Sequence, residues 1–313
     1  MISNAIPDLI DPLKAIHCDI RDQVVRACET SSREDLTVAS MAQDGDVIYG
    51  IDRISEERLV ELLTDVPPHV LIAEGIERRE NPDAQIRIIV DPIDGTRGLM
   101  YQKRSAWILT GVAPDKGDAT CLQDIELAIQ TEIPLLKQHL CDQIWVVKGK
   151  PVQAERYNRL TGERTPLELR PSTANNLTHG FASFSRFFPG TSVEMSKIEA
   201  AFADRLIEAP ADGKVVSFED QYISNAGQFY ELMAGHDRFV ADIRPVIDGG
   251  RGPAARPYDL CTELIAHSMG VVITDVNGER LNAPLDTVTP VPWIGYANES
   301  LRAVIEPVLL DLI

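Results

Sequence analysis

The chain has 313 residues, of which 44% are hydrophobic and 25% charged, so it is long enough to bury one large core or two lobes. This composition excludes a disordered chain, a collagen-like chain and a small domain held together by disulfides. Thirty Lys and Arg against 48 Asp and Glu give a net charge of −18, which repels polyanions, so we expect neither a nucleic acid polymer nor a membrane as a partner.

Two helices are predicted in the first 65 residues. From Ile10 to Ala27 apolar residues recur at steps of three and four, which predicts a helix that ends near Ser31. A second helical pattern covers residues 52–63 and follows a short apolar stretch. Asp52 stands at the start of this pattern, where its side chain could cap the helix.

Strands follow in the first half of the chain. Two short runs rich in β-branched residues, 70–73 and 85–90, lie between turn-forming residues, and each ends in a carboxylate. Residues 105–112 predict a further strand, and the alternation over residues 124–133 predicts a strand with one exposed face. The first half should therefore combine helices with a mostly antiparallel sheet.

A polar segment, residues 149–174, separates two differently patterned halves, and we place a lobe boundary between residues 171 and 172. Residues 1–171 are expected to form an α+β lobe. Residues 172–313 are expected to form an α/β lobe. In this second lobe the predicted helices and strands alternate: helices over 193–207, 226–234 and 258–268, and strands over 214–218, 238–243 and 270–275.

The cysteines and the N-terminal residues indicate the cellular compartment in which the protein is expected. Five cysteines, odd in number and never in a CxxC arrangement, argue against a disulfide framework and against a thiolate zinc site. The first 12 residues lack the basic stretch and apolar run of a signal peptide, and no window reaches about 18 uninterrupted apolar residues. We therefore expect a cytoplasmic protein.

The strongest chemical signal is DPIDGT at residues 91–96, directly after an apolar strand. Asp-Pro and Asp-Gly are also common turn dipeptides, so a plain turn is the alternative interpretation. Asp91 and Asp94 stand three residues apart around this turn, where both carboxylates can converge. Glu74 ends the neighbouring predicted strand and could reach the same point. The pattern therefore favours a site for hard cations such as Mg²⁺ or Mn²⁺ over one for zinc.

The chemistry of such a cluster points to phosphate. Neighbouring carboxylates cannot all stay ionised without compensation, which a bound cation supplies. Two divalent ions roughly 3.5–4 Å apart could bind a phosphoryl oxygen, generate hydroxide from water and stabilise the leaving oxygen. The backbone N–H groups of Gly95 and Thr96 could hold phosphate oxygens. These features together predict hydrolysis of a phosphomonoester without a covalent enzyme intermediate.

Three motifs, LIAE at residues 71–74, DPIDGT at 91–96, and PYDL at 257–260 leading into AHSMGVV at 266–272, resemble those of the inositol monophosphatase family. This magnesium-dependent, lithium-sensitive superfamily includes fructose-1,6-bisphosphatases and phosphatases of 3′-phosphoadenosine 5′-phosphate. The resemblance implies an α/β (α+β) fold, a layered α/β/α/β/α sandwich of the sugar-phosphatase type, with the active site between two lobes. The N-terminal lobe would carry most of the metal ligands, and the C-terminal lobe would contribute Asp259.

The resemblance also implies residue roles. Two or three Mg²⁺ ions, which Mn²⁺ could replace, would be held by Glu74, Asp91, Asp94, Asp259 and the carbonyl of Ile93. The backbone of Gly95 and Thr96 would bind the phosphate. Asp52, paired with the Thr96 hydroxyl, would orient or deprotonate the attacking water. For Asp52 and Asp259 a helix cap is the alternative interpretation.

The chain departs from the family pattern at two positions. Tyr258 stands where the family usually has Trp, and Gly75 stands where it often has a second acid, which affects a third metal site.

The resemblance makes an inositol phosphate the default substrate class, with hydrolysis of 3′-phosphoadenosine 5′-phosphate or fructose 1,6-bisphosphate as alternatives. A catalytically silent phosphometabolite-binding protein is the non-enzyme alternative. The family further implies a homodimer and inhibition by lithium. Candidates for binding a second phosphate, with salt-bridge or solvated surface roles as the alternative, are Arg97, Lys103, Arg104 and Arg186.

Overall fold

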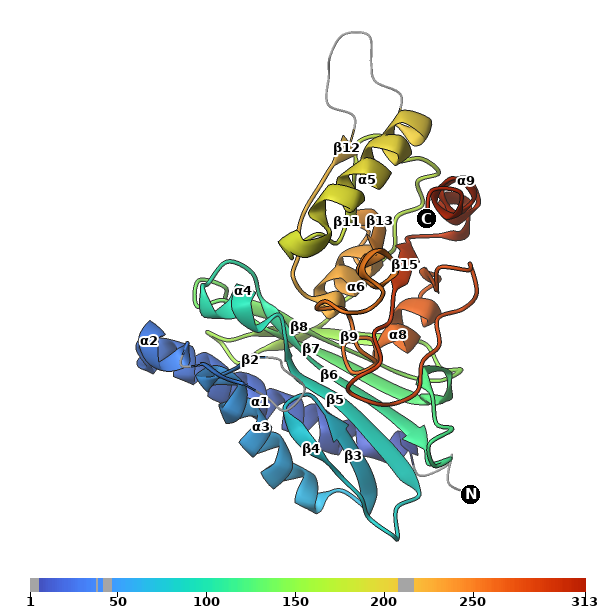
Figure 1. Cartoon of the computed structure of the whole chain (residues 1–313). Coiled ribbons are helices and arrows are strands. Elements are labelled where there is room, and N and C mark those ends of the chain that lie inside the picture. The colour runs from blue at the N-terminus through green and yellow to red at the C-terminus, as the bar shows by residue number, and fades with distance from the viewer. Residues whose placement is uncertain (1–5, 38, 42–46, 208–216) are drawn as a thin grey trace.

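The helices and strands form five layers in a computed structural model that describes residues 6–37, 39–41, 47–207 and 217–313 (Figure 1). An eight-stranded sheet and a five-stranded sheet are separated by helices, and further helices cover the outer face of each sheet. The predicted α/β/α/β/α sandwich is confirmed. Within the described ranges, no helix is both long and apolar enough to cross a membrane.

Helices α1 (Ile10–Thr30) and α3 (Gly50–Leu62) form the first layer and pack on the eight-stranded sheet. The predicted apolar face of α1 is buried, and the helix ends one residue before Ser31. The short helix α2 (Arg33–Leu36) and the two-stranded sheet of β1 (Ala39–Met41) and β2 (Val47–Tyr49) lie between these helices in the sequence.

The eight-stranded sheet has the order β10-β9-β8-β7-β6-β5-β3-β4. All neighbours are antiparallel except β3 and β5, so the prediction of a mostly antiparallel sheet is confirmed. Its strands are β3 (His69–Ala73), β4 (Ile76–Arg79), β5 (Ile86–Asp94), β6 (Ala106–Pro114), β7 (Leu127–Ile133), β8 (Leu140–Val147), β9 (Gln153–Asn158) and β10 (Arg164–Pro166).

The expectation of a half-exposed strand over residues 124–133 is wrong. Leu122–Asp124 forms a 3-10 turn, and β7 begins only after it. Every residue of β7 is buried, because α1 packs on one face of the strand and α8 on the other. Polar side chains on β7 are buried with partners: Gln130 Nε2 donates to the Ala226 carbonyl at 2.9 Å.

The middle layer consists of α6 (Asn225–Met233) and α8 (Glu263–Ser268), which lie between the two sheets (Figure 1). The predicted helix over residues 258–268 is too long: α8 starts at Glu263, and the preceding residues form turns, so Asp259 lies in a turn.

The second sheet has the order β12-β11-β13-β15-β14, and α5 (Ser192–Leu206) and α9 (Glu299–Leu310) lie on its outer side (Figure 1). Of the strand predicted at residues 214–218, residues 214–216 lie outside the described residues. The predicted boundary at residue 171 falls between the last strand of the first sheet and the first strand of the second, and the division into lobes stays a prediction. The strands are β11 (Gly180–Phe184), β12 (Ser217–Phe218), β13 (Asp237–Asp242), β14 (Val272–Thr274) and β15 (Trp293–Tyr296).

A buried histidine links α1 to the eight-stranded sheet. His17 Nε2 lies 2.7 Å from Thr110 Oγ1, and His17 Nδ1 lies 2.9 Å from Thr131 Oγ1. Burial lowers the pKa of His17 from 6.5 to about 3. The unfolded chain therefore takes up a proton near pH 6.5 that the folded chain does not. This difference lowers the free energy of unfolding as the pH falls from about 6.5 towards 3, by at most about 1.4 kcal/mol per pH unit.

We expect His17→Gln to remove this pH-dependent component, because glutamine can hydrogen-bond both threonines but does not titrate. The free energy of unfolding of the wild type, measured relative to that of the variant, should fall steadily from about pH 6.5 to pH 4.5. Urea titrations at several pH values measure it. A difference that stays constant over this range would contradict the neutral, buried state of His17.

Candidate active site

Strand β5 ends in an irregularity that brings Asp91 and Asp94 to the same side. Asp91 pairs with Leu109 and Asp94 with Trp107, so three steps along β5 match two steps along β6. Residues three apart in a regular strand point to opposite faces, and the extra residue of a β-bulge corrects this. The segment is thus a bulged strand end rather than a plain turn.

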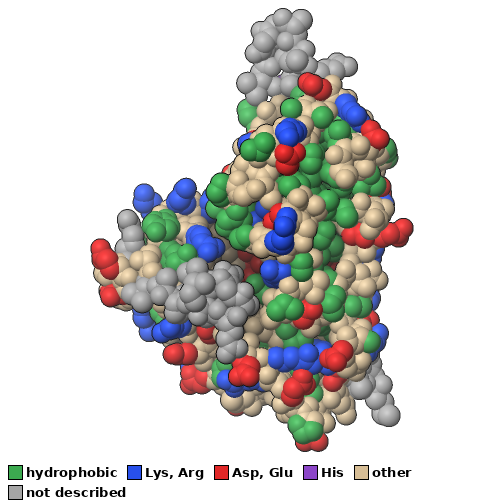
Figure 2. Space-filling model, viewed as in Figure 1, with side chains coloured by type: hydrophobic (Ala, Val, Ile, Leu, Met, Phe, Trp, Pro, Cys, Tyr) green, Lys and Arg blue, Asp and Glu red, His purple; other side chains and the backbone are tan. Residues whose placement is uncertain are grey.

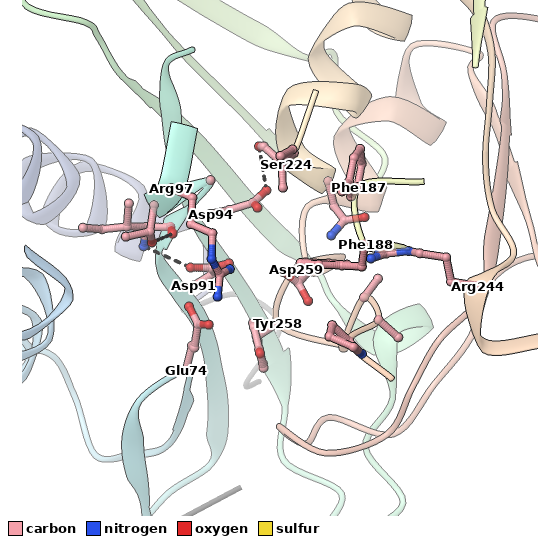
Figure 3. A pocket seen from close by; sticks show the side chains of 18 residues that line it. Glu74, Asp91, Asp94, Arg97, Phe187, Phe188, Ser224, Arg244, Tyr258 and Asp259 are labelled. Atoms are coloured by element: carbon pink, nitrogen blue, oxygen red, sulfur yellow. Dashed lines mark hydrogen bonds between the residues drawn. The ribbon is translucent and has the colours of Figure 1, made fainter. Parts of the chain in front are cut away.

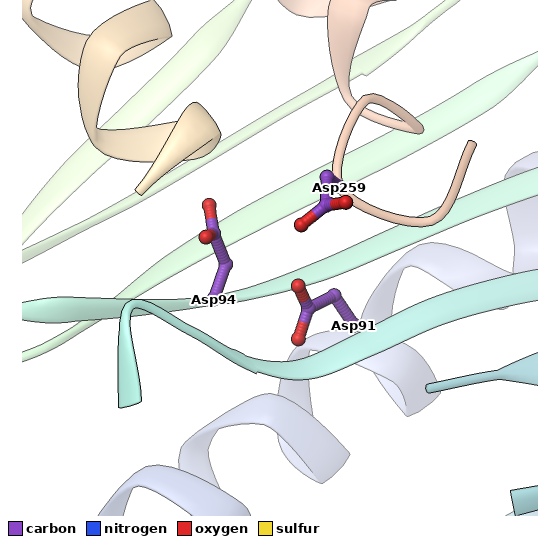
Figure 4. A group of neighbouring side chains, drawn as sticks. All are labelled: Asp91, Asp94 and Asp259. Atoms are coloured by element: carbon purple, nitrogen blue, oxygen red, sulfur yellow. The ribbon is translucent and has the colours of Figure 1, made fainter. Parts of the chain in front are cut away.

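A third carboxylate joins them from the other half of the chain. Asp259 lies in the turn before α8, and one oxygen of each of Asp91, Asp94 and Asp259 lies within 4.8 Å of the other two (Figure 4). Glu74, directly after β3, lines the same pocket (Figure 3). The structure therefore brings the four predicted carboxylates to one pocket, although residues 74 and 259 are far apart in the sequence. Figure 2 shows a hollow between the lower and upper parts of the molecule, with basic side chains beside it.

The three aspartates of this pocket are difficult to ionise. Burial raises the pKa of Asp91 well above its usual range, and the charges of Glu74, Asp94 and Asp259 raise it further. Burial raises the pKa of Asp94 to about 6, although hydrogen bonds from the Ala226 amide and the Ser224 hydroxyl oppose this shift. Burial, followed by the charge of Asp94, raises the pKa of Asp259. Since a nearby cation relieves this repulsion and all four side chains offer only oxygen, the donor set fits hard divalent cations.

Hydrogen bonds fix the direction of each aspartate. Asp94 Oδ2 accepts from Ser224 Oγ at 2.9 Å and from the Ala226 amide at 2.6 Å, which ties the start of α6 to the end of β5. Asp259 Oδ2 accepts from the backbone amide of Arg256 at 2.6 Å. The Ile93 amide donates to Asp91 Oδ1 at 3.0 Å, so a backbone N–H group holds each of the three aspartates.

The Asp52 side chain makes the contacts that both interpretations of the sequence require. Its Oδ2 accepts from the Tyr49 amide at 2.9 Å, which caps α3, and its Oδ1 lies 2.9 Å from Thr96 Oγ1. Thr96 Oγ1 also lies 2.9 Å from the Ile93 carbonyl oxygen. The hydroxyl can donate its single hydrogen to either acceptor, and its oxygen can then accept a hydrogen bond from a water molecule.

The short helix α4 (Thr96–Met100) begins beside the carboxylates. Gly95 precedes it with a φ of 100°, a left-handed conformation that side chains rarely adopt, and a Cβ at this position would lie 3.1 Å from the Ser224 Cβ. The first N–H groups of a helix have no acceptor within the helix. Gly95 and Thr96 both line the pocket, as the prediction of a phosphate-binding turn requires.

Of the basic residues considered for a second phosphate, only Arg97 lines this pocket, and its Nε donates to the Tyr49 hydroxyl at 3.1 Å. Arg104 and Arg186 each pair with two carboxylates outside it. Lys103 is exposed and does not line it.

The departure from the family pattern at Gly75 has a structural reason. Gly75 has a φ of 70°, and a Cβ there would overlap the carboxylate of Glu56 from α3. Burial, followed by the charge of Asp52, raises the pKa of Glu56 to about 7. The space beside Glu74 is thus occupied by an acid from a different element.

Several pocket residues are missed by sequence reasoning. One of them, Arg244, could have been found from the sequence. It belongs to the Asp-Ile-Arg run at the end of the apolar strand β13, and charged residues are rarely buried without a partner or a function. The missed residues are Phe187, Phe188, Ser224, Asn225 and Arg244.

No family model matches the chain. Among curated proteins, it is 30% identical over 69 residues to the Nus factor SuhB of Haemophilus influenzae and 32% identical over 69 residues to that of Pasteurella multocida. The matched segment covers 22% of this chain and 26% of each relative, so it spans about a quarter of the length of the curated relatives.

Solved structures resemble nearly the whole chain. The SuhB protein of Bartonella henselae gives a TM-score of 0.68 at 17% identity, over 96% of this chain and 98% of its own. The IMPase of Thermotoga maritima gives 0.66 at 15% identity, over 97% and 98%. The fructose-1,6-bisphosphatase of Leishmania major gives 0.68 at 14% identity, over 97% and 93%. The resemblance indicated by the motifs is confirmed for the fold: the chain has the fold of the inositol monophosphatase superfamily.

Proposed function

We propose that the chain is a Mg²⁺-dependent phosphatase of a small phosphorylated metabolite, with an inositol phosphate as the default substrate. The observation that carries this proposal is the meeting of three aspartate oxygens within 4.8 Å in a pocket that Gly95 and Thr96 also line. The cations would be held by Glu74, Asp91, Asp94, Asp259 and the carbonyl oxygen of Ile93. Such cations polarise a phosphate and lower the pKa of a bound water.

The remaining residues would orient the reactants. The amides of Gly95 and Thr96 would donate to phosphate oxygens, which stabilises negative charge on them. The Thr96 hydroxyl, with its proton directed to Asp52 Oδ1, would accept a hydrogen bond from the attacking water and align it with phosphorus. Asp52 Oδ1 would accept that hydrogen bond, and the Tyr49 amide, which donates to Asp52 Oδ2, would hold the carboxylate in this position.

Related properties belong to the same proposal. The site would lie between the lobes of residues 1–171 and 172–313 of a cytoplasmic homodimer, and lithium would inhibit the reaction. The fructose-1,6-bisphosphatase neighbour supports a sugar bisphosphate as an alternative substrate, beside 3′-phosphoadenosine 5′-phosphate. The non-enzyme alternative, a silent phosphometabolite-binding protein, would retain the pocket and lack turnover.

A phosphate-release assay tests the proposal. The purified protein with Mg²⁺ should release phosphate from at least one ester in a panel of inositol, nucleotide and sugar phosphates, and excess chelator should abolish the release. Adding lithium to the same assay tests the expected inhibition of phosphate release. Binding of an ester without release would favour the silent protein, and unchanged release in excess chelator would refute a metal-dependent reaction.

A further inference from the structure

Arg244, the first residue of α7 (Arg244–Asp248), is a buried arginine on the wall of the pocket, with only 3% of its surface exposed. Its side chain enters on the side of Asp259, away from Glu74 (Figure 3). Arg244 Nε donates to Asp242 Oδ1 at 2.7 Å and Nη2 donates to Asp242 Oδ2 at 2.5 Å. This two-point pair fixes the plane of the guanidinium group.

The third nitrogen of this group, Nη1, makes no hydrogen bond within the ranges of the chain that the structure describes. Arg244 Nη1 is also buried. A buried donor without an acceptor costs free energy, so native proteins rarely leave one. The fixed guanidinium therefore holds two N–H donors ready for a ligand.

Aromatic rings shield this nitrogen from competition by water. The guanidinium carbon of Arg244 lies 5.0 Å from the ring centre of Phe187 and 5.1 Å from that of Phe188, and both phenylalanines line the pocket. In such surroundings a hydrogen bond to a charged acceptor is stronger than in water. Because Nη1 can only donate, it suits an acceptor-only oxygen of a phosphate or carboxylate better than a hydroxyl, which also has a proton to place.

We propose that Arg244 Nη1 binds a second anionic group of the substrate, a phosphate or a carboxylate, while the reacting phosphate lies at Gly95, Thr96 and the aspartates. This inference rests on the proposed function and narrows its substrate class: the preferred substrate carries an anionic group that is not the one hydrolysed. Arg244 is then a specificity residue and takes no part in the chemical step.

Pairs of esters that differ by one anionic group test this role. A second phosphate distinguishes fructose 1,6-bisphosphate from fructose 1-phosphate, inositol 1,4-bisphosphate from inositol 1-phosphate, and adenosine 3′,5′-bisphosphate from adenosine 3′-phosphate. A carboxylate distinguishes 3-phosphoglycerate from glycerol 3-phosphate. The wild type should prefer the doubly anionic member of at least one pair by roughly 10- to 100-fold in kcat/KM, as expected for one hydrogen bond to a charged group. The pair that shows the preference identifies the second group.

Two variants assign the preference to Arg244. Arg244→Gln should reduce the preference to about threefold or less, mainly through KM, because kcat/KM falls more for the doubly anionic ester than for the singly charged one. Because this change leaves Asp242 buried without its arginine, the double variant Asp242→Asn with Arg244→Gln removes both charges and guards against misfolding. Circular dichroism confirms the fold of each.

Arg156 provides a matched control. It makes the same two-point pair with a buried aspartate, Asp142, at 2.7 and 2.8 Å, but lines a different cavity. Arg156→Gln should leave the preference unchanged.

Failure of this inference is distinct from failure of the proposed function. No preference in any pair, or a preference that survives in both Arg244 variants, would overturn the role of Arg244 in an active phosphatase. If no ester is hydrolysed, the proposed function fails, and titration calorimetry with the same ester pairs decides the inference: binding must favour the doubly anionic member in the wild type and lose that preference in the variants.

Discussion

Replacing Asp94 by asparagine is expected to lower kcat/KM for Mg²⁺-dependent phosphate release by about 10³-fold or more, with the fold retained. Asparagine has the shape of aspartate and an oxygen that can accept from Ser224 Oγ and the Ala226 amide, so the link between α6 and β5 can persist. The charge that would hold a divalent cation is lost, and that charge supports several kcal/mol of transition-state stabilisation. Initial rates at saturating Mg²⁺ measure the loss, and thermal unfolding checks the fold.

The matched control is Asp142→Asn on β8. Asp142 is also a buried aspartate that accepts hydrogen bonds, from Arg156 and from the Tyr230 hydroxyl at 2.6 Å, but it does not line the pocket. This variant should keep activity within about threefold when assayed below its unfolding temperature. Comparable activity of Asp94→Asn and the wild type would refute the role of Asp94 as a cation ligand.

The sequence predicted the part of the site that depends on local order. Asp91 and Asp94 end a strand that its apolar run reveals, and Glu74 follows the preceding predicted strand. The parallel pairing of β3 and β5 then brings these acids to one edge of the sheet. Asp259 required the resemblance, because the pattern around it also reads as a helix cap. The structure places it in a turn before α8, a distinction of a few residues that periodicity does not resolve.

What the sequence could not predict depends on contacts between distant segments. The prediction of a half-exposed strand at β7 failed because α8, whose residues come 130 or more positions later, covers the other face of the strand. Arg244 and Phe187 come together only through tertiary packing, in which α7 contacts the 3-10 turn Pro189–Thr191 and α5, and neither residue belongs to a motif. That Arg244 Nη1 has no hydrogen-bond partner among the described residues can be recognised only from the three-dimensional structure.

Mg²⁺ is expected to stabilise the wild type against thermal unfolding, and Asp91→Asn is expected to abolish this effect while raising the stability measured in chelator. At a concentration about 100 times the dissociation constant, a ligand that binds only the folded chain adds about 2.7 kcal/mol to the free energy of unfolding. Without cations, burial and the charges of Glu74, Asp94 and Asp259 disfavour ionised Asp91, so folding at neutral pH carries a cost, whether the group binds a proton or stays charged. Asparagine removes that cost and keeps an oxygen to accept from the Ile93 amide.

Asp115→Asn is the matched control for Asp91→Asn. It should lower the stability measured in chelator and keep the stabilisation by Mg²⁺, whereas Asp91→Asn should do the reverse. Arg87 Nε donates to Asp115 Oδ1 at 2.6 Å, so losing this carboxylate should lower the stability in chelator, and the stabilisation by Mg²⁺ should remain because Asp115 does not line the pocket. Calorimetric scans with Mg²⁺ and with chelator measure both quantities without any assay of turnover. A cluster of acids with a purely structural role would give no Mg²⁺ shift in the wild type and a loss of stability in Asp91→Asn. The two results together therefore separate a cation site, whose acids repel one another until it is filled, from an acidic network that stabilises the fold by itself.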